Sequence, residues 1–95
     1  MDALEALADP TRRRMIELLS VQDLTAGNIA ARFEQSRPAV SRHLRLLREA
    51  RVVDVRTEGT RRIYTLRRDP LADAEQWLRE RLDALDTELR RARRG

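Results

Sequence analysis

Residues 36–50, which read SRPAVSRHLRLLREA, constrain the fold of this chain more than any other stretch. Val40, Leu44 and Leu47 recur at the i, i+4, i+7 spacing that places three apolar side chains on one stripe of an α-helix. That stripe has to be buried. The remaining helix surface carries guanidinium and hydroxyl groups at Arg37, Ser41, Arg42, Arg45 and Arg48. Such a surface suits a polyanion, so we interpret the segment as a DNA-reading helix.

The length and composition indicate one small, surface-charged domain. Ninety-five residues form a core that buries only part of the unfolded chain's surface, so burial in a dimer would help the fold. Charged residues make up 38% of the chain and hydrophobic residues 41%, and no apolar run is long enough to span a membrane. The start, MDAL, does not resemble a signal peptide, so we expect a cytoplasmic protein. The absence of cysteine excludes disulfides, thiolate metal sites and cysteine nucleophiles.

The positive charge is concentrated in the middle of the chain. Residues 32–68 hold eleven arginines and four acidic residues, a net charge of +7, whereas residues 1–31 carry −2 and residues 69–95 carry −1. Phosphate contacts supply most of the non-specific affinity for nucleic acids, and a basic band of this kind is typical of a nucleic-acid surface. Ordinary solvated surface charge is the alternative.

Two helices are predicted at the N-terminal end. Residues 1–8 contain a short amphipathic segment with Leu4 and Leu7, and the pair Asp9-Pro10 caps and starts a second helix that runs to about Ser20. Three arginines near the start of that helix are predicted to lie on the surface and to contact the DNA backbone: Arg12, Arg13 and Arg14.

A helix-turn-helix is predicted over residues 25–50. Thr25 is a suitable N-cap for a helix that ends near Phe33, and Ile29 and Phe33 are four residues apart on its buried side. After a polar two-residue connector, Ser36 can cap the next helix and Pro38 fits its first turn. A short helix, a tight turn and a helix with a charged outer face form this DNA-binding motif, although any two packed helices can imitate it.

Residues 52–67 are predicted to form a β-hairpin. Apolar and polar residues alternate from Val53 to Arg56, Gly59 supplies the turn, and Ile63 belongs to the returning strand. Three arginines gather near the tip, at Arg56, Arg61 and Arg62. A hairpin after a helix-turn-helix would form a basic wing that contacts phosphates or a minor groove. If the hairpin served only to cover the edge of the core, that role would account for its valines but not for these arginines.

The last helix is predicted over residues 70–92, opened by Asp69-Pro70. Its apolar residues recur every three or four positions, as in a coiled-coil seam. A helix of about 23 residues is roughly 35 Å long, more than so small a domain can cover with its own core, so we expect it to pack against a second copy. The predicted dimer interface combines residues of the first and last helices: Leu4, Leu7, Leu71, Ala74, Trp77, Leu78, Leu82, Leu85 and Leu89.

Taken together, three motifs give the chain a resemblance to the ArsR/SmtB family of bacterial winged-helix repressors. They are ALADPTRRRMIELL, SRPAVSRHLRLLREA and GTRRIYTL, in that order. The resemblance implies a mainly α fold with a small β-hairpin wing, in the order helix-helix-helix-helix-β-β-helix, with the first and last helices at a dimer interface. The chain departs from the family pattern at Arg51, where glycine usually follows the recognition helix.

The resemblance also implies a function. Family members repress transcription by binding an inverted repeat, and many release it when an effector binds. By position, Arg37, Ser41 and Arg42 match the residues that contact bases and backbone, and either arginine can donate two hydrogen bonds to a guanine. Ser36 starts the same helix, and Arg45 is expected to contact phosphate. Two recognition helices about 34 Å apart would read an interrupted palindrome in double-stranded DNA.

The metal ligands of the better-known family members are not kept. Where thiol-type sensors have Cys-x-Cys, this chain has Thr-Ala-Gly at residues 25–27. In the last helix, Asp73, Glu75, Asp86 and Leu89 stand where zinc-type sensors place an aspartate and histidines. The stretch DPLADAEQWL resembles members without a metal site. We therefore expect no metal and no cofactor, and the sequence does not identify an effector.

Other functions fit the sequence less well. An enzyme is not expected, because the single histidine, His43, lies on a different side of its helix from Ser41 and forms no catalytic pair with it. A dimeric protein-interaction module would explain the long last helix but not the basic band. A metal- or small-molecule-responsive repressor, or a winged-helix regulator of the MarR type, would keep DNA binding.

Overall fold

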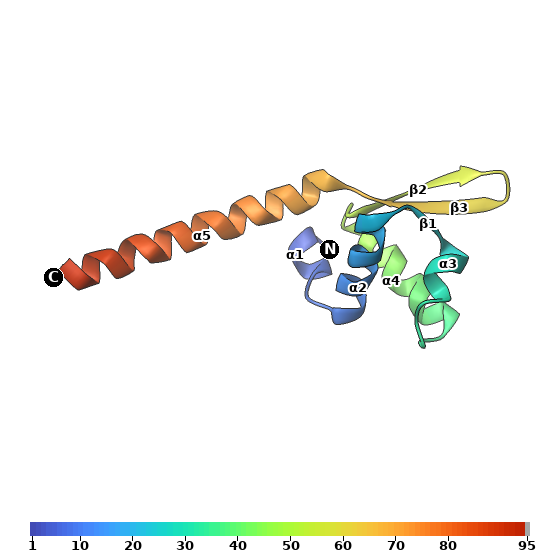
Figure 1. Ribbon diagram of the computed structural model, residues 1–95, viewed down its shortest axis with the longest axis horizontal. Coiled ribbons are helices and arrows are strands. Elements are labelled where there is room, and N and C mark those ends of the chain that lie inside the picture. Colours follow the sequence, from blue (N-terminus) through green and yellow to red (C-terminus); the bar gives the residue numbers. More distant parts are fainter. Residues whose placement is uncertain (95) are drawn as a thin grey trace.

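A computed structural model describes residues 1–94, and its most prominent feature is one long helix that projects from a small body. The molecule measures 64 × 25 × 23 Å, and the projecting helix accounts for its length (Figure 1). The body contains four helices and a small sheet. No helix in the described part of the chain is both long enough and apolar enough to cross a membrane.

The first two helices begin at aspartate caps. The helix α1 (Ala3–Ala6) has a capping box, in which Asp2 accepts from the N–H of Glu5 and the Glu5 side chain accepts from the N–H of Asp2. The helix α2 (Pro10–Val21) starts after Asp9, whose carboxylate accepts from the N–H of Arg12 at 3.1 Å. The predicted Asp9-Pro10 start is confirmed.

Arg12 lies in the core and not on the surface, so the prediction of a surface arginine was wrong at this position. Its side chain is only 9% exposed, and it donates from Nε to the carbonyl oxygen of Ala6 at 2.9 Å and from Nη2 to that of Glu5 at 3.2 Å. The last carbonyls of a helix have no partner within the helix. Arg12 donates to the Ala6 carbonyl and adds a second donor to the Glu5 carbonyl, which also accepts from the N–H of Ala8, and it thereby joins α1 to α2.

The helix-turn-helix consists of α3 (Ala26–Ala30) and α4 (Arg37–Glu49). Thr25 caps α3 and Ser36 caps α4, as predicted. The helix α3 ends three residues before Phe33, because the N–H groups of Arg32 and Phe33 donate to carbonyls only three residues back. The connector is held to α2 by a hydrogen bond from Gln35 Nε2 to Thr11 Oγ1 at 2.8 Å.

The sheet has three antiparallel strands, one more than the sequence predicted. The hairpin strands β2 (Val53–Glu58) and β3 (Arg61–Leu66) pair along their whole length, and β1 (Leu24–Thr25) pairs with the other edge of β3. A two-residue strand is too short to show an alternating pattern. The turn between β2 and β3 has Gly59 at its first position with a φ of +62°, a conformation that favours glycine.

The core lies where α2, α3, α4 and the sheet meet. Its largest fully buried side chains come from all of these elements: Met15, Ile29, Leu47, Val40, Val52 and Val53. The stripe predicted on α4 is therefore confirmed as its buried face.

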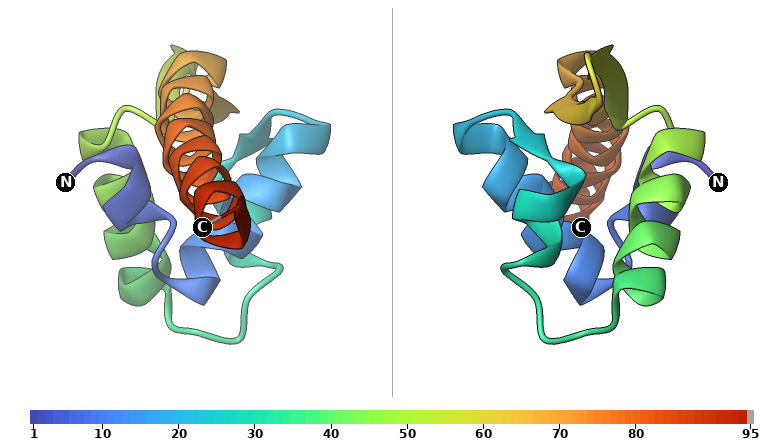
Figure 2. Two further views of the ribbon diagram at one scale, coloured as in Figure 1. Left: turned by 90° about the vertical axis from the view of Figure 1, so that its left-hand side faces the viewer. Right: turned by 90° about the vertical axis from the view of Figure 1, so that its right-hand side faces the viewer.

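The last helix, α5 (Arg68–Arg94), begins two residues before the predicted position and continues two residues beyond the predicted end at residue 92. Asp69 and Pro70 therefore lie inside its first turn, where a missing N–H costs no hydrogen bond. Ala74 is buried, with only 7% of its surface exposed, and Leu71 packs against the core. The helix α1 is the neighbour of α5 in this region. Figure 2, seen along the long axis, shows α5 nearly end-on, with α1 and α4 on one side of it.

Candidate nucleic-acid interface

The exposed face of α4 carries the polar residues that the sequence singled out. Val40, Leu44 and Leu47 hold the helix on the core, which turns the polar residues outward. The exposed residues of this face are Arg37, Ser41, Arg42, Arg45 and Arg48. Ser36 lies at the start of the helix, where its hydroxyl accepts from the N–H of Ala39 at 3.3 Å. The structure thus brings the helix residues of the predicted interface together on one element.

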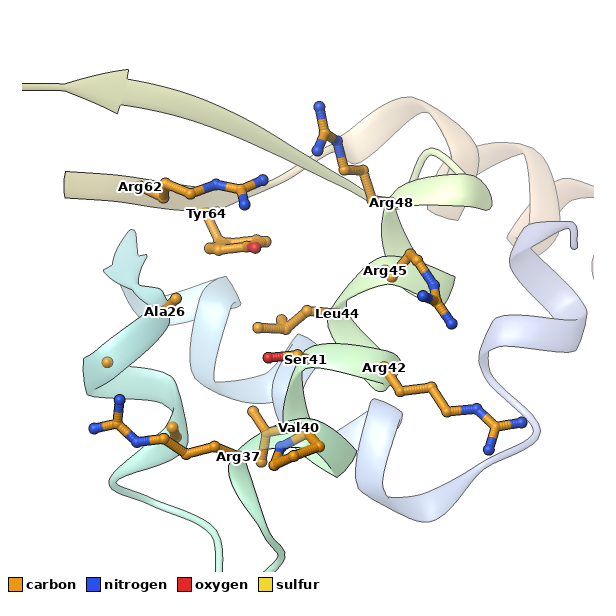
Figure 3. Close-up of a pocket in the computed structure, with 13 residues that line it drawn as sticks. Ala26, Arg37, Val40, Ser41, Arg42, Leu44, Arg45, Arg48, Arg62 and Tyr64 are labelled. Atoms are coloured by element: carbon orange, nitrogen blue, oxygen red, sulfur yellow. The ribbon is translucent and has the colours of Figure 1, made fainter. Parts of the chain in front are cut away.

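A concave surface lies between α3, α4 and β3, with a volume of about 660 Å³. Tyr64 and Arg62 of β3 face α4 across it in Figure 3. The figure also shows the side chains of Arg37 and Arg42 leaving α4 in opposite directions. The residues that line it are Ala26, Gly27, Ala30, Arg37, Pro38, Val40, Ser41, Arg42, Leu44, Arg45, Arg48, Arg62 and Tyr64. Helix and wing arginines therefore share one positively charged hollow.

The arginines of the wing fall into two groups. Arg61 and Arg62 are exposed next to the turn of the hairpin. Arg56 is engaged in two ion pairs, from Nη1 to Asp23 Oδ2 and from Nε to Glu58 Oε1, both at 3.1 Å. Hydrogen bonds from the Thr65 hydroxyl and from Arg56 lower the pKa of Asp23, and the bonds to Asp23 and Glu58 raise the pKa of Arg56.

Sequence reasoning missed Asp23 as a partner of the wing. The residue directly precedes β1 and touches side chains of both hairpin strands, Arg56 on β2 and Thr65 on β3. No local pattern marks it, because its partners lie more than thirty residues away along the chain. Asp23 therefore links the wing to the loop that leads into the helix-turn-helix.

His43 on α4 faces the cap of α2. Its Nδ1 atom lies 3.7 Å from Asp9 Oδ2 and has no hydrogen-bond partner, and its side chain is 20% exposed. Burial opposes ionisation of Asp9, but the hydrogen bond from the Arg12 N–H and the nearby His43 and Arg12 lower its pKa overall. His43 thus belongs to the contact between α2 and α4.

The residues predicted for a dimer interface divide between the body and the projecting part of α5. Leu4, Leu7 and Leu71 are half-buried and Ala74 is buried within the protomer. The remaining large apolar side chains are 46–59% exposed and form a continuous stripe, here called the α5 seam: Trp77, Leu78, Leu82, Leu85 and Leu89. The guanidinium group of Arg81 lies over the Trp77 ring in a cation–π contact, 4.8 Å from the ring centre.

Acidic residues on α5 do not converge on a metal-binding arrangement in the described residues. Asp73, Glu75 and Asp86 occur on the helix, but within residues 1–94 no three histidine, cysteine or carboxylate side chains are grouped closely enough to hold a metal ion.

Comparison with known proteins identifies the family. The sequence profile described as "Bacterial regulatory protein, arsR family" matches residues 9–55, which span α2, β1, α3, α4 and the start of β2. The transcriptional repressor SdpR of Bacillus subtilis is 35% identical over 93% of this chain and 98% of its own length. The chain belongs to the ArsR family.

Solved structures of ArsR-family proteins share the fold. A crystal structure of an ArsR family transcriptional regulator, RHA00566, superposes with a TM-score of 0.81 at 28% identity, covering 87% of this chain and 91% of that one. A possible transcriptional regulator for arsenical resistance superposes with a TM-score of 0.78 at 40% identity, covering 93% and 96%. The mainly helical winged helix-turn-helix with a small antiparallel sheet is thus confirmed.

Membership of the ArsR family establishes the class of activity. This protein is a DNA-binding transcriptional regulator, and the family is not a family of enzymes, as the sequence predicted. The matched residues 9–55 contain all of α4 but neither Arg61 nor Arg62 of the wing. The roles of individual residues therefore rest on their positions in this structure.

Proposed function

We propose that this ArsR-family regulator is a dimeric repressor that binds an interrupted inverted repeat and has no built-in metal site. The observation that carries the proposal is the shared hollow, in which arginines of α4 and Arg62 of β3 surround one concave surface. Phosphate contacts from such a surface supply affinity, while contacts to base edges supply specificity.

Each residue of the interface has a proposed role. Arg37 and Arg42 diverge along α4, so each can reach a different base pair and donate to guanine O6 and N7. Ser41 contacts a base or a phosphate, and Arg45 a phosphate. Ser36 holds the first turn of the helix in place through its cap hydrogen bond.

The wing supplies contacts that do not depend on sequence. Arg61 and Arg62 are proposed to contact phosphates next to the recognition helix. Arg56 also belongs to the proposed interface, but its guanidinium is already paired with Asp23 and Glu58, which supports a role in fixing the wing rather than in a free phosphate contact.

The dimer is proposed from the exposure of the α5 seam. Trp77, Leu78, Leu82, Leu85 and Leu89 expose about half of each side chain to solvent, and burial of such apolar surface favours association. A two-fold dimer would present two α4 helices to successive major grooves about 34 Å apart.

The lack of a metal site is proposed from the residue types present. Leu89 stands where zinc-type sensors have their last ligand, and two of the remaining positions hold Glu75 and Asp86 in place of histidines. Carboxylates without imidazole or thiolate ligands form a poor site for zinc.

A binding titration tests the proposed function. The purified protein is titrated against its own upstream DNA and a scrambled duplex at two salt concentrations, with and without added zinc. Tight, sequence-selective binding that zinc does not change is expected. Equal and weak binding to both duplexes would contradict the proposal and favour a dimeric protein-interaction module, and a zinc-dependent loss of binding would favour a metal-responsive repressor.

A further inference from the structure

Tyr64 brings a buried hydroxyl group to the hollow between α3, α4 and β3. The residue lies on the central strand of the sheet, and only 7% of its surface is exposed. Its hydroxyl makes no hydrogen bond with any group of residues 1–94. Buried polar groups in folded proteins nearly always have a hydrogen-bond partner. The partner of Tyr64 therefore comes from outside the chain, through the hollow.

A second hydroxyl group opens on the same space. Figure 3 shows the oxygen atom of Tyr64 directed toward α4, while Ser41 and Leu44 point from α4 into the hollow. The Ser41 side chain, like that of Tyr64, forms no hydrogen bond within the described residues 1–94. The strand and the helix thus each present one hydroxyl group to a molecule held between them.

The charged residues around the hollow are all positive. Five of its thirteen lining residues are arginines and none is acidic: Arg37, Arg42, Arg45, Arg48 and Arg62. None of these arginines forms an ion pair in the part of the chain that the structure describes, residues 1–94. Guanidinium groups bind phosphates and carboxylates through pairs of parallel hydrogen bonds. The hollow therefore favours an anion.

The hollow also has apolar walls. Four aliphatic side chains line it beside the ring of Tyr64: Ala26, Ala30, Val40 and Leu44. Its volume of about 660 Å³ falls in the range of small-molecule sites, about 300–1,000 Å³, which combine apolar walls with a few polar groups. Inorganic phosphate would satisfy the arginines but leave these walls uncovered. The matching ligand combines an anionic group with a flat apolar ring.

A ligand in the hollow and duplex DNA exclude each other. Arg37, Ser41 and Arg62 line the hollow and also belong to the proposed DNA interface. Double-stranded DNA is stiff over the length of a binding site, so its backbone lies across the mouth of the hollow and does not fold into it. A ligand inside the hollow occupies the same arginines and removes them from the phosphates.

We propose that the hollow is a binding site for a small aromatic anion, an aryl phosphate or aryl carboxylate, that displaces DNA by direct competition. Arg62 and Tyr64 are two residues apart on one strand, so their side chains lie on the same face. Arg62 pairs with the anionic group, the Tyr64 hydroxyl donates to it, and the ring lies against Leu44. This inference rests on the proposed DNA interface and adds a regulatory ligand and its site.

Direct binding in the absence of DNA tests the site. The probe is phenyl phosphate, and inorganic phosphate and phenol at the same ionic strength each supply one half of it. By isothermal titration calorimetry, we expect a Kd of about 1 mM for phenyl phosphate and binding at least about tenfold weaker for either half. If inorganic phosphate bound as tightly as phenyl phosphate, the hollow would hold an adventitious ion only and the proposal would be overturned.

Two neighbouring arginines provide a matched pair of variants. Arg62→Gln removes a charge that lines the hollow, whereas Arg61→Gln removes the same charge from the next residue, which points to the other face of the strand and does not line the hollow. We expect the Kd of phenyl phosphate to rise about fivefold or more for the first variant and less than about twofold for the second. Tyr64→Phe keeps the ring and should raise it about threefold. Equal effects of the two arginine variants would overturn the site.

Competition with DNA tests the regulation. The apparent Kd for the protein's own upstream DNA should rise in proportion to the phenyl phosphate concentration, without a plateau. A plateau would place the probe outside the hollow and overturn the proposal. Sequence-selective DNA binding with no binding of the probe would overturn the ligand site alone. Probe binding that depends on Arg62 but leaves DNA binding unchanged would remove the hollow from the DNA interface, and the proposed function would lose its main support as well.

Discussion

Replacing Arg51 with glycine is expected to stabilise the protein, although it removes a side chain and a charge. Arg51 directly follows α4 with a φ of +61°, in the left-handed region. Its N–H donates to the carbonyl of Arg48 and the N–H of Val52 donates to that of Leu47, both at 3.0 Å. These two bonds form a Schellman motif, which fixes the backbone at a position where glycine is the usual residue.

The size of the effect follows from two opposing contributions. The left-handed conformation costs a residue with a Cβ atom about 1–2 kcal/mol. A glycine at this position also makes the unfolded chain more flexible. The extra conformational entropy lost on folding offsets about 0.5–1 kcal/mol of this gain. The free energy of unfolding should therefore rise by about 0.5–1 kcal/mol, and the Tm of a domain of this size by about 2–8 °C.

Urea and thermal unfolding at one fixed protein concentration measure this change. Arg51→Ala is the matched control, because it removes the same charge but keeps the Cβ atom, and it should give no gain. The reverse change, Gly59→Ala at a φ of +62°, should lower the free energy of unfolding by about 1 kcal/mol. If Arg51→Ala stabilised the protein as much as Arg51→Gly, relief of charge repulsion and not of backbone strain would be the cause.

Three further predictions concern single side chains. Arg42→Ala should weaken operator binding by about 1–3 kcal/mol and relax the preference at one base pair, whereas Arg61→Ala should weaken binding to all DNA sequences alike. Equal losses of affinity for operator and random DNA in the Arg42→Ala variant would contradict the base-reading role of Arg42. Arg12→Ala should lower the free energy of unfolding by about 1–3 kcal/mol in urea titrations, because it removes the guanidinium donor of the Ala6 carbonyl and one of the two donors of the Glu5 carbonyl, and a neutral effect would refute that role. Arg56→Ala and Asp23→Asn should weaken DNA binding by similar factors without changing its salt dependence, and a smaller salt slope for Arg56→Ala alone would show a direct phosphate contact.

Local signals in the sequence predicted the helices that begin at caps. Asp9, Thr25 and Ser36 each accept a hydrogen bond from an N–H three residues ahead, as their residue types and positions indicated. The hairpin and its glycine turn were also predictable, because strand alternation and turn chemistry are short-range properties. The exposed positions of the α4 arginines followed from the same periodicity, which placed them away from the apolar stripe of that helix.

Features that depend on how separate elements pack together were not predictable in this way. Arg12 looked like one of three surface arginines, and only the packing of α1 against α2 shows that its guanidinium is buried. The strand β1 forms because Leu24 meets Tyr64, forty residues later, and has no pattern of its own. The pairing of Arg56 with Asp23 likewise depends on the folded position of the wing.

The exposed α5 seam has a consequence for how much of the protein a cell must make. Five large apolar side chains, each 46–59% exposed, belong to a protomer whose own core is small. When the seam is covered by association, the free energy of unfolding increases with protein concentration, because mass action stabilises the folded and associated chain. A chain of this kind would be degraded most readily when few copies are present, so its own abundance would set the threshold at which regulation begins.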